Sequence, residues 1–198
     1  MTRARDMANL GSQAGSGLDA SDITTGVLPF GVTGGSGLTH LASNPTVTLG
    51  SNATFPAGHV IQVLTATNST EANTTSESFV AMSLGLNITP NSTSSRFFII
   101  CNTSGYNNGG GNHVGYWTIY RDSTNLGPAN GYGNMYQGSG ANEHLGTNIC
   151  ISELDSPTIP STPIAITYGM YVRSNSDSYN TYWSMNQSRS DITVMEIA

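Results

Sequence analysis

The sequence predicts an all-β protein, a β-sandwich of the jelly-roll kind preceded by a Gly-rich extended arm. Three observations predict it. Apolar residues come in short runs rich in aromatic and β-branched side chains, which is typical of strands. From Phe79 onward several runs alternate apolar and polar residues with the period of two that a strand requires. Segments rich in Asn, Gly, Ser and Thr separate these runs and indicate turns and loops.

Composition excludes several classes of partner. Charged residues make up only 9% of the 198 residues, and the net charge is −6. A nucleic-acid binder would show a basic stripe, and a protein that docks on anionic lipid needs clustered cations, so we expect neither partner. No apolar run approaches the length of a bilayer span, so we expect no membrane insertion.

Residues 1–58 differ from the rest and form the predicted arm. They contain no Trp or Tyr, and glycines interrupt any helical period. Such a segment cannot bury a core of its own. The first residues are positively charged but no apolar stretch follows them, so we expect synthesis in the cytoplasm without an export signal. The predicted domains are therefore an arm at 1–58 and a sandwich at 59–198.

The expected strands follow in order, with a short one already inside the arm. They span residues 46–49, 59–65, 79–88, 96–101, 116–121, 144–154, 164–172, 182–185 and 192–197. From Ser78 onward we expect about eight strands, which suits a jelly roll or a related sandwich. We expect the run 96–101 to be buried on both faces, because it is the most continuous apolar run. Residues 102–113 and 127–141 are predicted to be long polar loops.

The two cysteines do not make a disulfide framework. Cys101 and Cys150 both lie in apolar, strand-like runs. We expect two buried free thiols, because Cys is often buried without bonding. The sequence leaves open whether the two pair across neighbouring strands.

A motif in the arm resembles a segment of bacteriophage virion proteins. Residues 22–29 read D-I-T-T-G-V-L-P, and residues 34–38 read G-G-S-G-L. This pattern resembles a segment found repeatedly in tail-fibre and other virion proteins of tailed bacteriophages. The resemblance implies a homotrimer whose arm attaches to other virion proteins of the tail or capsid. The candidate anchoring residues in the arm are Arg3, Arg5, Leu10, Ile23 and Leu28.

Parts of the second half are similar to structural proteins of marine bacteriophages. The similar segments are residues 118–127, 154–157 and 192–198. The sequence departs from that pattern in the loops at 105–113 and 127–141, and variable loops on a rigid scaffold commonly carry recognition. Tyrosines among small polar residues are typical of adaptable binding loops, although they could equally pack under their own loops or at a subunit interface. The candidate binding residues are Tyr106, Asn107, His113, Tyr132, Tyr136 and Glu143.

The sequence offers little chemistry for catalysis or metal binding. The four histidines are scattered, with no partner at metal-ligand spacing, so we expect no metal and no cofactor. Glycoside hydrolysis needs two placed carboxylates, and the few acidic residues form no such pair in sequence. We therefore expect a protein that is not an enzyme.

Together these features predict a fibre-type attachment protein of a phage virion. Its arm would hold the particle, and its sandwich would project and contact host surface glycans. Three alternatives remain open. One is a capsid decoration or head-fibre protein without an essential receptor, the second is a free carbohydrate-binding module, and the third is a polysaccharide depolymerase.

Overall fold

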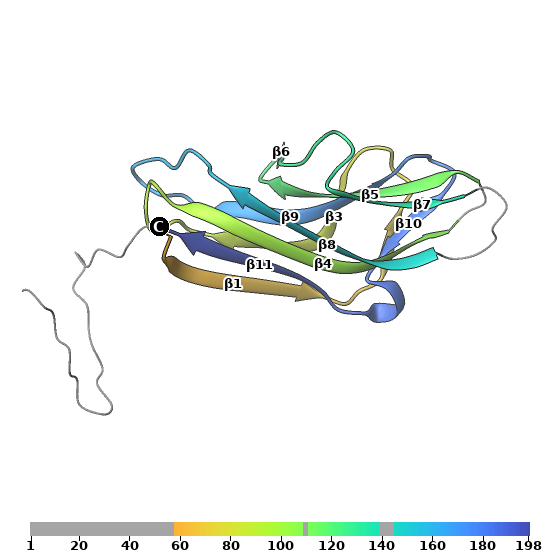
Figure 1. Ribbon diagram of the computed structural model, residues 1–198, viewed down its shortest axis with the longest axis horizontal. Helices are drawn as coiled ribbons and strands as arrows, with labels where there is room; N and C mark the ends of the chain where they lie inside the picture. The colour runs from red at the N-terminus through yellow and green to blue at the C-terminus, as the bar shows by residue number, and fades with distance from the viewer. Residues whose placement is uncertain (1–57, 109–110, 139–144) are drawn as a thin grey trace, which may run out of the picture. The chain divides into compact units, whose positions relative to one another are not determined.

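The computed structural model describes residues 58–108, 111–138 and 145–198, which form two antiparallel sheets packed face to face (Figure 1). The strands are β1 (Val60–Asn68), β2 (Ala72–Thr74), β3 (Val80–Ile88), β4 (Arg96–Asn108), β5 (His113–Arg121), β6 (Thr124–Asn125), β7 (Gly133–Gln137), β8 (Leu145–Asp155), β9 (Ile166–Ser174), β10 (Asn180–Trp183) and β11 (Ser190–Ile197). A 3-10 turn, η2 (Met185–Gln187), joins β10 to β11. No helix in these ranges is long and apolar enough to cross a membrane.

Sheet A is organised around the long strand β4. One side of β4 pairs along its length with β8, from Phe97 opposite Asp155 to Asn107 opposite Leu145. The other side pairs first with β11 and then with β10, so β4 bridges two shorter strands. Strand β1 pairs with β11 and forms the outer edge, while β2 pairs with β10.

Sheet B has the order β3-β9-β5, and β7 and β6 share the remaining side of β5. The eight longer strands therefore form two four-stranded arrays, β1-β11-β4-β8 and β3-β9-β5-β7. Except for β5 and β7, which are neighbours in one array, consecutive strands of these eight cross between the arrays. This is the connectivity of a jelly roll, in which eight strands make two Greek keys. This confirms the predicted all-β sandwich.

The core lies between the sheets and is built from alternate residues of each strand. Phe97 of β4 meets Tyr168 of β9 across it, with ring centroids 5.6 Å apart. The buried apolar side chains also include Met82, Leu84, Ile88, Ile99, Cys101, Trp117, Ile119, Met170, Val172, Ile192 and Val194. The period-two runs in the sequence correspond to this inner face.

The prediction that residues 96–101 are buried on both faces is wrong. Phe97, Ile99 and Cys101 are fully buried, but Phe98 and Ile100 lie on the outer face of sheet A and are partly exposed. The run is continuously apolar because its outward residues are apolar too. An antiparallel sheet covered on one side leaves the other side open.

Two predicted loops contain strand residues. Strand β4 continues to Asn108 and β5 begins at His113, so only four residues separate the two strands in the sequence. Strand β7 lies inside the predicted loop 127–141. The prediction failed because some polar residues of these segments are buried in the sandwich and form hydrogen bonds with one another there. Thr103, for example, is buried with its Oγ1 2.7 Å from the Oγ of Ser190.

The cysteine prediction is correct for Cys101 and wrong for Cys150. Both thiols are free, and Cys101 is buried in the core. Cys150 sits between Ile149 and Ile151, whose side chains point inward, so its own side chain points outward and is exposed. Cys150 is opposite Asn102 in register, not opposite Cys101.

The two ends of the sandwich differ. Gly58 donates its N–H to the carbonyl of Ala198 at 2.9 Å, so the chain enters the sandwich beside its C-terminus. The β8–β9 connection at 156–165 lies at this same end, because Asp155 pairs with Phe97 at the start of β4. The β4–β5 and β9–β10 connections lie at the opposite end (Figure 1). The arm residues, including the expected strand at 46–49, lie outside the described residues.

Candidate functional site

The end of the sandwich opposite to Gly58 holds most of the residues expected to bind a ligand. Tyr136 of β7 is 53% exposed, and its hydroxyl donates to Oδ1 of Asn112 at 2.7 Å. Asn175 donates from its side chain to the carbonyl of Asn112 at 3.1 Å and so ties the β4–β5 connection to β9. Glu143 lies outside the described residues. Tyr136 is therefore an exposed ring held by a neighbouring loop.

Asn107 and His113 are not on the surface, so the expectation that they contact a ligand is wrong. Both are fully buried. Asn107 donates to the carbonyl of Met135 at 2.9 Å, and Nε2 of His113 lies 3.1 Å from both Ser174 Oγ and Thr181 Oγ1. These contacts join β4, β7, β5, β9 and β10 beneath the connections. The two residues thus hold the end of the sandwich in place from inside.

The tautomer of His113 follows from its neighbours. The hydroxyl of Ser174 donates to the carbonyl of Ser176 at 2.7 Å, and that of Thr181 donates to Oδ1 of Asn107 at 3.2 Å. With both hydroxyl hydrogens used, Nε2 of His113 carries the hydrogen and Nδ1 is a buried acceptor without a partner in the described residues. Burial lowers the pKa of His113, because charging the ring would place an uncompensated cation inside.

Tyr106 and Tyr132 pack on other parts of the sandwich. The Tyr106 ring stacks on Tyr182 across the β4–β10 pair, with centroids 4.2 Å apart. Burial, together with the nearby charge of Glu71, raises the pKa of Tyr106 to about 12. Tyr132 donates its hydroxyl to Glu153 at 2.8 Å. Both half-buried tyrosines fit the alternative of packing within the structure, whereas Tyr136 presents its ring outward.

The outer face of sheet A carries an apolar row that spans four strands. Val63 of β1 is opposite Met195 of β11, Met195 is opposite Phe98 of β4, and Phe98 is opposite Leu154 of β8. Val63 is 52% exposed and Leu154 is 46% exposed. We call Val63, Met195, Phe98 and Leu154 the sheet A row. The next row on this face, with Ile100 at its centre, is also uncharged.

The edge of sheet A beside this row has few of the features that block pairing with another chain. Strand β1 has β11 as its only ladder partner in the described residues, and its sequence VIQVLTATN has no charge, Gly or Pro. Val60, Ile61 and Leu64 are exposed along it. Natural edge strands usually carry charges, prolines or bulges that block pairing with another chain. Strand β1 carries only a bulge at Ile61.

The outer face of sheet B is different, because it carries aromatic rings with polar groups between them. Tyr120 of β5 stacks on Tyr171 of β9, with centroids 4.0 Å apart, and Phe79 meets Tyr120 edge-on at 6.2 Å. The guanidinium of Arg173 lies 4.1 Å from the ring centroid of Tyr116 and 5.3 Å from that of Phe79. Arg173 also donates to Oδ1 of Asn130 at 2.8 Å. We call this set of rings the sheet B platform.

A surface hollow of about 320 Å³ adjoins the platform at Tyr171. Small residues of β3 and β9 form much of it, and a carboxylate and a threonine lie beside them. Its lining comprises Ala81, Ser83, Leu84, Gly85, Asp122, Thr167, Gly169 and Tyr171. An aromatic wall with a few convergent polar groups is typical of small-molecule sites.

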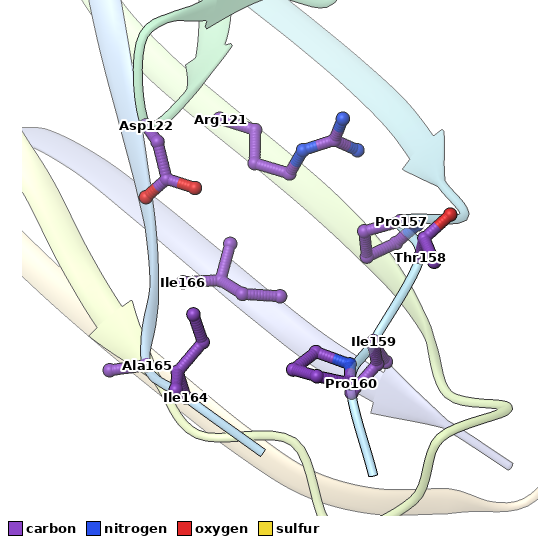
Figure 2. Close-up of a pocket in the computed structure, with 9 residues that line it drawn as sticks. All are labelled: Arg121, Asp122, Pro157, Thr158, Ile159, Pro160, Ile164, Ala165 and Ile166. Carbon is purple, nitrogen blue, oxygen red and sulfur yellow. The ribbon is translucent and has the colours of Figure 1, made fainter. Parts of the chain in front are cut away.

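A second hollow, of about 240 Å³, lies at the end where the chain enters (Figure 2). Arg121 and Asp122 stand on one side, and prolines and isoleucines of residues 157–166 surround the rest. The guanidinium of Arg121 contacts both carboxylate oxygens of Asp155, at 2.6 and 2.8 Å, and Asp155 also accepts from Tyr168 at 2.7 Å. The charge of Arg121 is thereby matched, so Arg121 does not present a free cation to a ligand in this hollow.

Sequence reasoning missed the sheet B platform because it looked for recognition in loops. Tyr116, Tyr120, Tyr171 and Arg173 lie within strands, at outward positions. A signal was present in the alternation itself. Every second residue from Ile166 to Val172 is apolar and points inward. The residues at the alternate positions, including Tyr171 and Arg173, must therefore point outward.

Comparison with known proteins identifies no family. No protein-family model matches the chain, and no curated protein matches it. Among solved structures, the chain is similar to one in the structure of infectious bursal disease virus Gx strain, at 14% identity and a TM-score of 0.36. It is also similar to one from the Gt strain, at 9% identity and a TM-score of 0.28.

Each of these similarities covers 78% of this chain, but only 40% of the Gx chain and 46% of the Gt chain. The chain thus spans less than half the length of the solved chains it matches. At these TM-scores the two structures add nothing to the strand order described above.

Proposed function

We propose that this chain is a structural subunit of a tailed-bacteriophage virion, a fibre-type attachment protein that acts by binding and not by catalysis. Its arm at 1–58 attaches to other virion proteins, and its sandwich projects toward the host surface as part of a homotrimer. The observation that carries the proposal is the polarity of the sandwich. The chain enters beside its C-terminus at one end, where Gly58 meets Ala198, and Tyr136 with its neighbouring connections lies at the other.

That polarity suits an anchored, projecting subunit. Strand β4 has 13 residues and runs between the two ends, which separates them by roughly 40 Å. A partner that holds the arm therefore leaves the opposite end free. The jelly roll occurs in viral capsid and lectin domains, so the fold is compatible with this role without requiring it.

The outer face of sheet A supports self-association. Exposed apolar patches on soluble proteins commonly mark interaction sites. Two copies of a chain with a net charge of −6 repel each other through acidic surfaces, but the sheet A row and the row beside it carry no charge. A second copy of this chain can therefore cover Val63, Met195, Phe98 and Leu154 without burying like charges.

Two other functions fit particular observations. A capsid decoration or head-fibre protein would use the same arm and the same sheet A row, but would need no receptor site. A free carbohydrate-binding module would use the sheet B platform and would not need the apolar row. The attachment proposal is preferred because it gives a role to the apolar face, the aromatic face and the arm together.

The test is to label particles that encode this chain with an antibody against the purified protein and to image them by electron microscopy. Labelling of the tail or its fibres is the expected result. Labelling spread over the head would replace the proposal with the decoration alternative. Particles without label, from lysates in which the protein is free, would overturn a virion role.

A further inference from the structure

The hollow beside Tyr171 is formed by a pair of glycines in register. Gly85 of β3 is opposite Gly169 of β9. A Cβ on Gly85 would lie 2.9 Å from the carbonyl oxygen of Tyr168, which is closer than real Cβ atoms approach backbone. A Cβ on Gly169 would lie 3.5 Å from the ring of Tyr171 and would point into the same space. The absence of both side chains leaves an open space beside the Tyr171 ring.

The backbone of β3 is distorted at this place. Residues 82–84 stand against the single residue Met170 of β9, between the pairs Ala81–Tyr171 and Gly85–Gly169. Ser83 has a φ of 56°, in the left-handed region that residues other than glycine rarely adopt. Strain of this kind is concentrated at binding and catalytic sites. Here it presents Ser83, which lines the hollow, on the outer surface of sheet B.

The polar groups of the hollow have unused hydrogen-bonding capacity. Oδ1 of Asp122 accepts from the backbone N–H of Thr167 at 3.0 Å, which fixes the carboxylate. Within the described residues, the other carboxylate oxygen and the hydroxyls of Ser83 and Tyr171 make no hydrogen bond. The ring of Tyr171 is already held by its stack on Tyr120. A ligand would meet these groups with little ordering left to do.

We propose that this hollow binds a neutral pyranose unit of a surface saccharide, with its apolar face on Tyr171 and its hydroxyls on Asp122 and Ser83. A sugar ring has an apolar face of C–H groups, which can pack on the Tyr171 ring, and a rim of hydroxyl groups, which can donate to Asp122 and Ser83. The volume lies at the lower end of the roughly 300–1,000 Å³ typical of small-molecule sites.

The charge of the site selects among saccharides. A carboxylate such as Asp122 accepts hydrogen bonds from hydroxyl groups but repels an acidic sugar. Arg173, the nearest cation on this face, is already engaged by Tyr116, Phe79 and Asn130. The inference therefore excludes glycans whose recognition depends on a uronic or sialic acid. It deepens the proposed function, because it rests on the expectation of a glycan receptor and assigns its site to the hollow beside the sheet B platform.

The experiment is a titration of the full-length protein with neutral hexose oligosaccharides and, separately, with uronic-acid oligosaccharides. Calorimetry and saturation-transfer NMR measure the binding. Four variants accompany the wild type. Tyr171→Ala removes the aromatic ring, Tyr171→Phe keeps the ring without its hydroxyl, and Gly169→Val fills the space beside it. Tyr182→Ala removes a ring from the outer face of sheet A and is the matched control. Circular dichroism and thermal unfolding show whether each variant folds.

We expect the wild type to bind neutral saccharides. Tyr171→Ala and Gly169→Val should each weaken binding at least tenfold, and Tyr182→Ala should change it less than twofold. Tyr171→Phe keeps the ring and should keep most of the affinity. The comparison of Tyr171→Phe with Tyr171→Ala therefore tests the site even if Gly169→Val does not fold. The site is overturned if no neutral saccharide binds, if Tyr171→Ala binds as well as Tyr182→Ala does, or if acidic saccharides bind better. None of these outcomes bears on whether antibody labels the particle, so a failure here and a failure of the virion role are distinguishable.

Discussion

Tyr120 and Tyr171 stack across neighbouring strands of sheet B, with ring centroids 4.0 Å apart and ring planes 21° apart. The two residues are not opposite in register, since Tyr120 faces Gly169 and Tyr171 faces Thr118. The stack is therefore diagonal, and it forms over the space that Gly169 leaves. This arrangement couples the aromatic platform to the hollow, because the same glycine makes room for both.

Arg173 should stabilise the platform, because its guanidinium lies over Tyr116 and beside Phe79. We expect Arg173→Ala to lower the free energy of unfolding by about 1 kcal/mol. Arg173→Lys should recover only part of this, because an ammonium group lacks the planar fork that also reaches Asn130. Chemical denaturation at neutral pH measures both. Equal stability of wild type and Arg173→Ala would contradict a structural role for the stacked cation.

Glu196 is a buried carboxylate held by neutral donors. Gln62 donates to it at 2.6 Å, Asn91 donates from backbone and side chain at 2.7 and 2.8 Å, and the hydroxyl of Ser95 donates as well. Burial alone would raise the pKa of Glu196, but the hydrogen bonds from Ser95, Gln62 and Asn91 outweigh it and hold the pKa below its usual value.

The folded-state pKa of Glu196 is thus lower than the unfolded-state pKa, so its stabilisation is present above about pH 4.3 and is lost as the pH falls through the folded-state pKa. We expect Glu196→Gln to cost about 2 kcal/mol at pH 7, because the amide turns one acceptor into a donor among donors. The difference between wild type and variant should shrink toward pH 3. Denaturation curves between pH 7 and pH 3 check this, and a difference that grows on acidification would contradict it.

Asp155 joins the end of β8 to β5 and β9 through Arg121 and Tyr168. Asp155→Asn leaves the guanidinium without its charge partner, and we expect a loss of about 3 kcal/mol in stability. Arg189→Ala is the control, because its contact with Asp191 is 3.9 Å long and lies on the surface. That change should stay within about 0.5 kcal/mol. Similar effects of the two substitutions on thermal unfolding would refute the assignment.

The two thiols should differ in reactivity. Burial raises the pKa of Cys101 to about 12, and the charge of Asp191 adds to the effect. Cys150 is exposed. Alkylation of the native protein at pH 8, followed by mass spectrometry, should modify one thiol per chain quickly, and Cys150→Ser should remove that reaction. Rapid modification of Cys101 in the native state would show that the inner face of β4 is open.

Part of the fold was predictable because the inner face obeys a simple alternation. In the alternating run that begins at Phe79, Met82, Leu84 and Ile88 of β3 are buried on the inner face. The prediction failed where burial is satisfied by hydrogen bonds instead of apolar contact. Thr103, Asn107 and similar residues are interior, but their composition is that of a surface loop.

The candidate site was less predictable than the fold. The expected residues Asn107 and His113 proved to be interior supports, and the outward rings of Tyr116, Tyr120 and Tyr171 were not anticipated. Which face of a strand meets solvent follows from alternation, but which outward residues gather depends on register. The hollow needs Gly85 opposite Gly169, and no sequence pattern states that these residues are paired.

The measurement that tests the account most directly is the mass of the full-length protein by sedimentation equilibrium, for the wild type and for Val63→Glu. The sheet A row is proposed to be covered by a second copy, and a glutamate at the exposed position 63 would place like charges in that contact. We expect a trimer for the wild type, a smaller species for Val63→Glu, and a trimer for the control Tyr136→Glu at the far end. A monomeric wild type, or a Val63→Glu protein that remains trimeric, would contradict the proposal that this face joins the subunits.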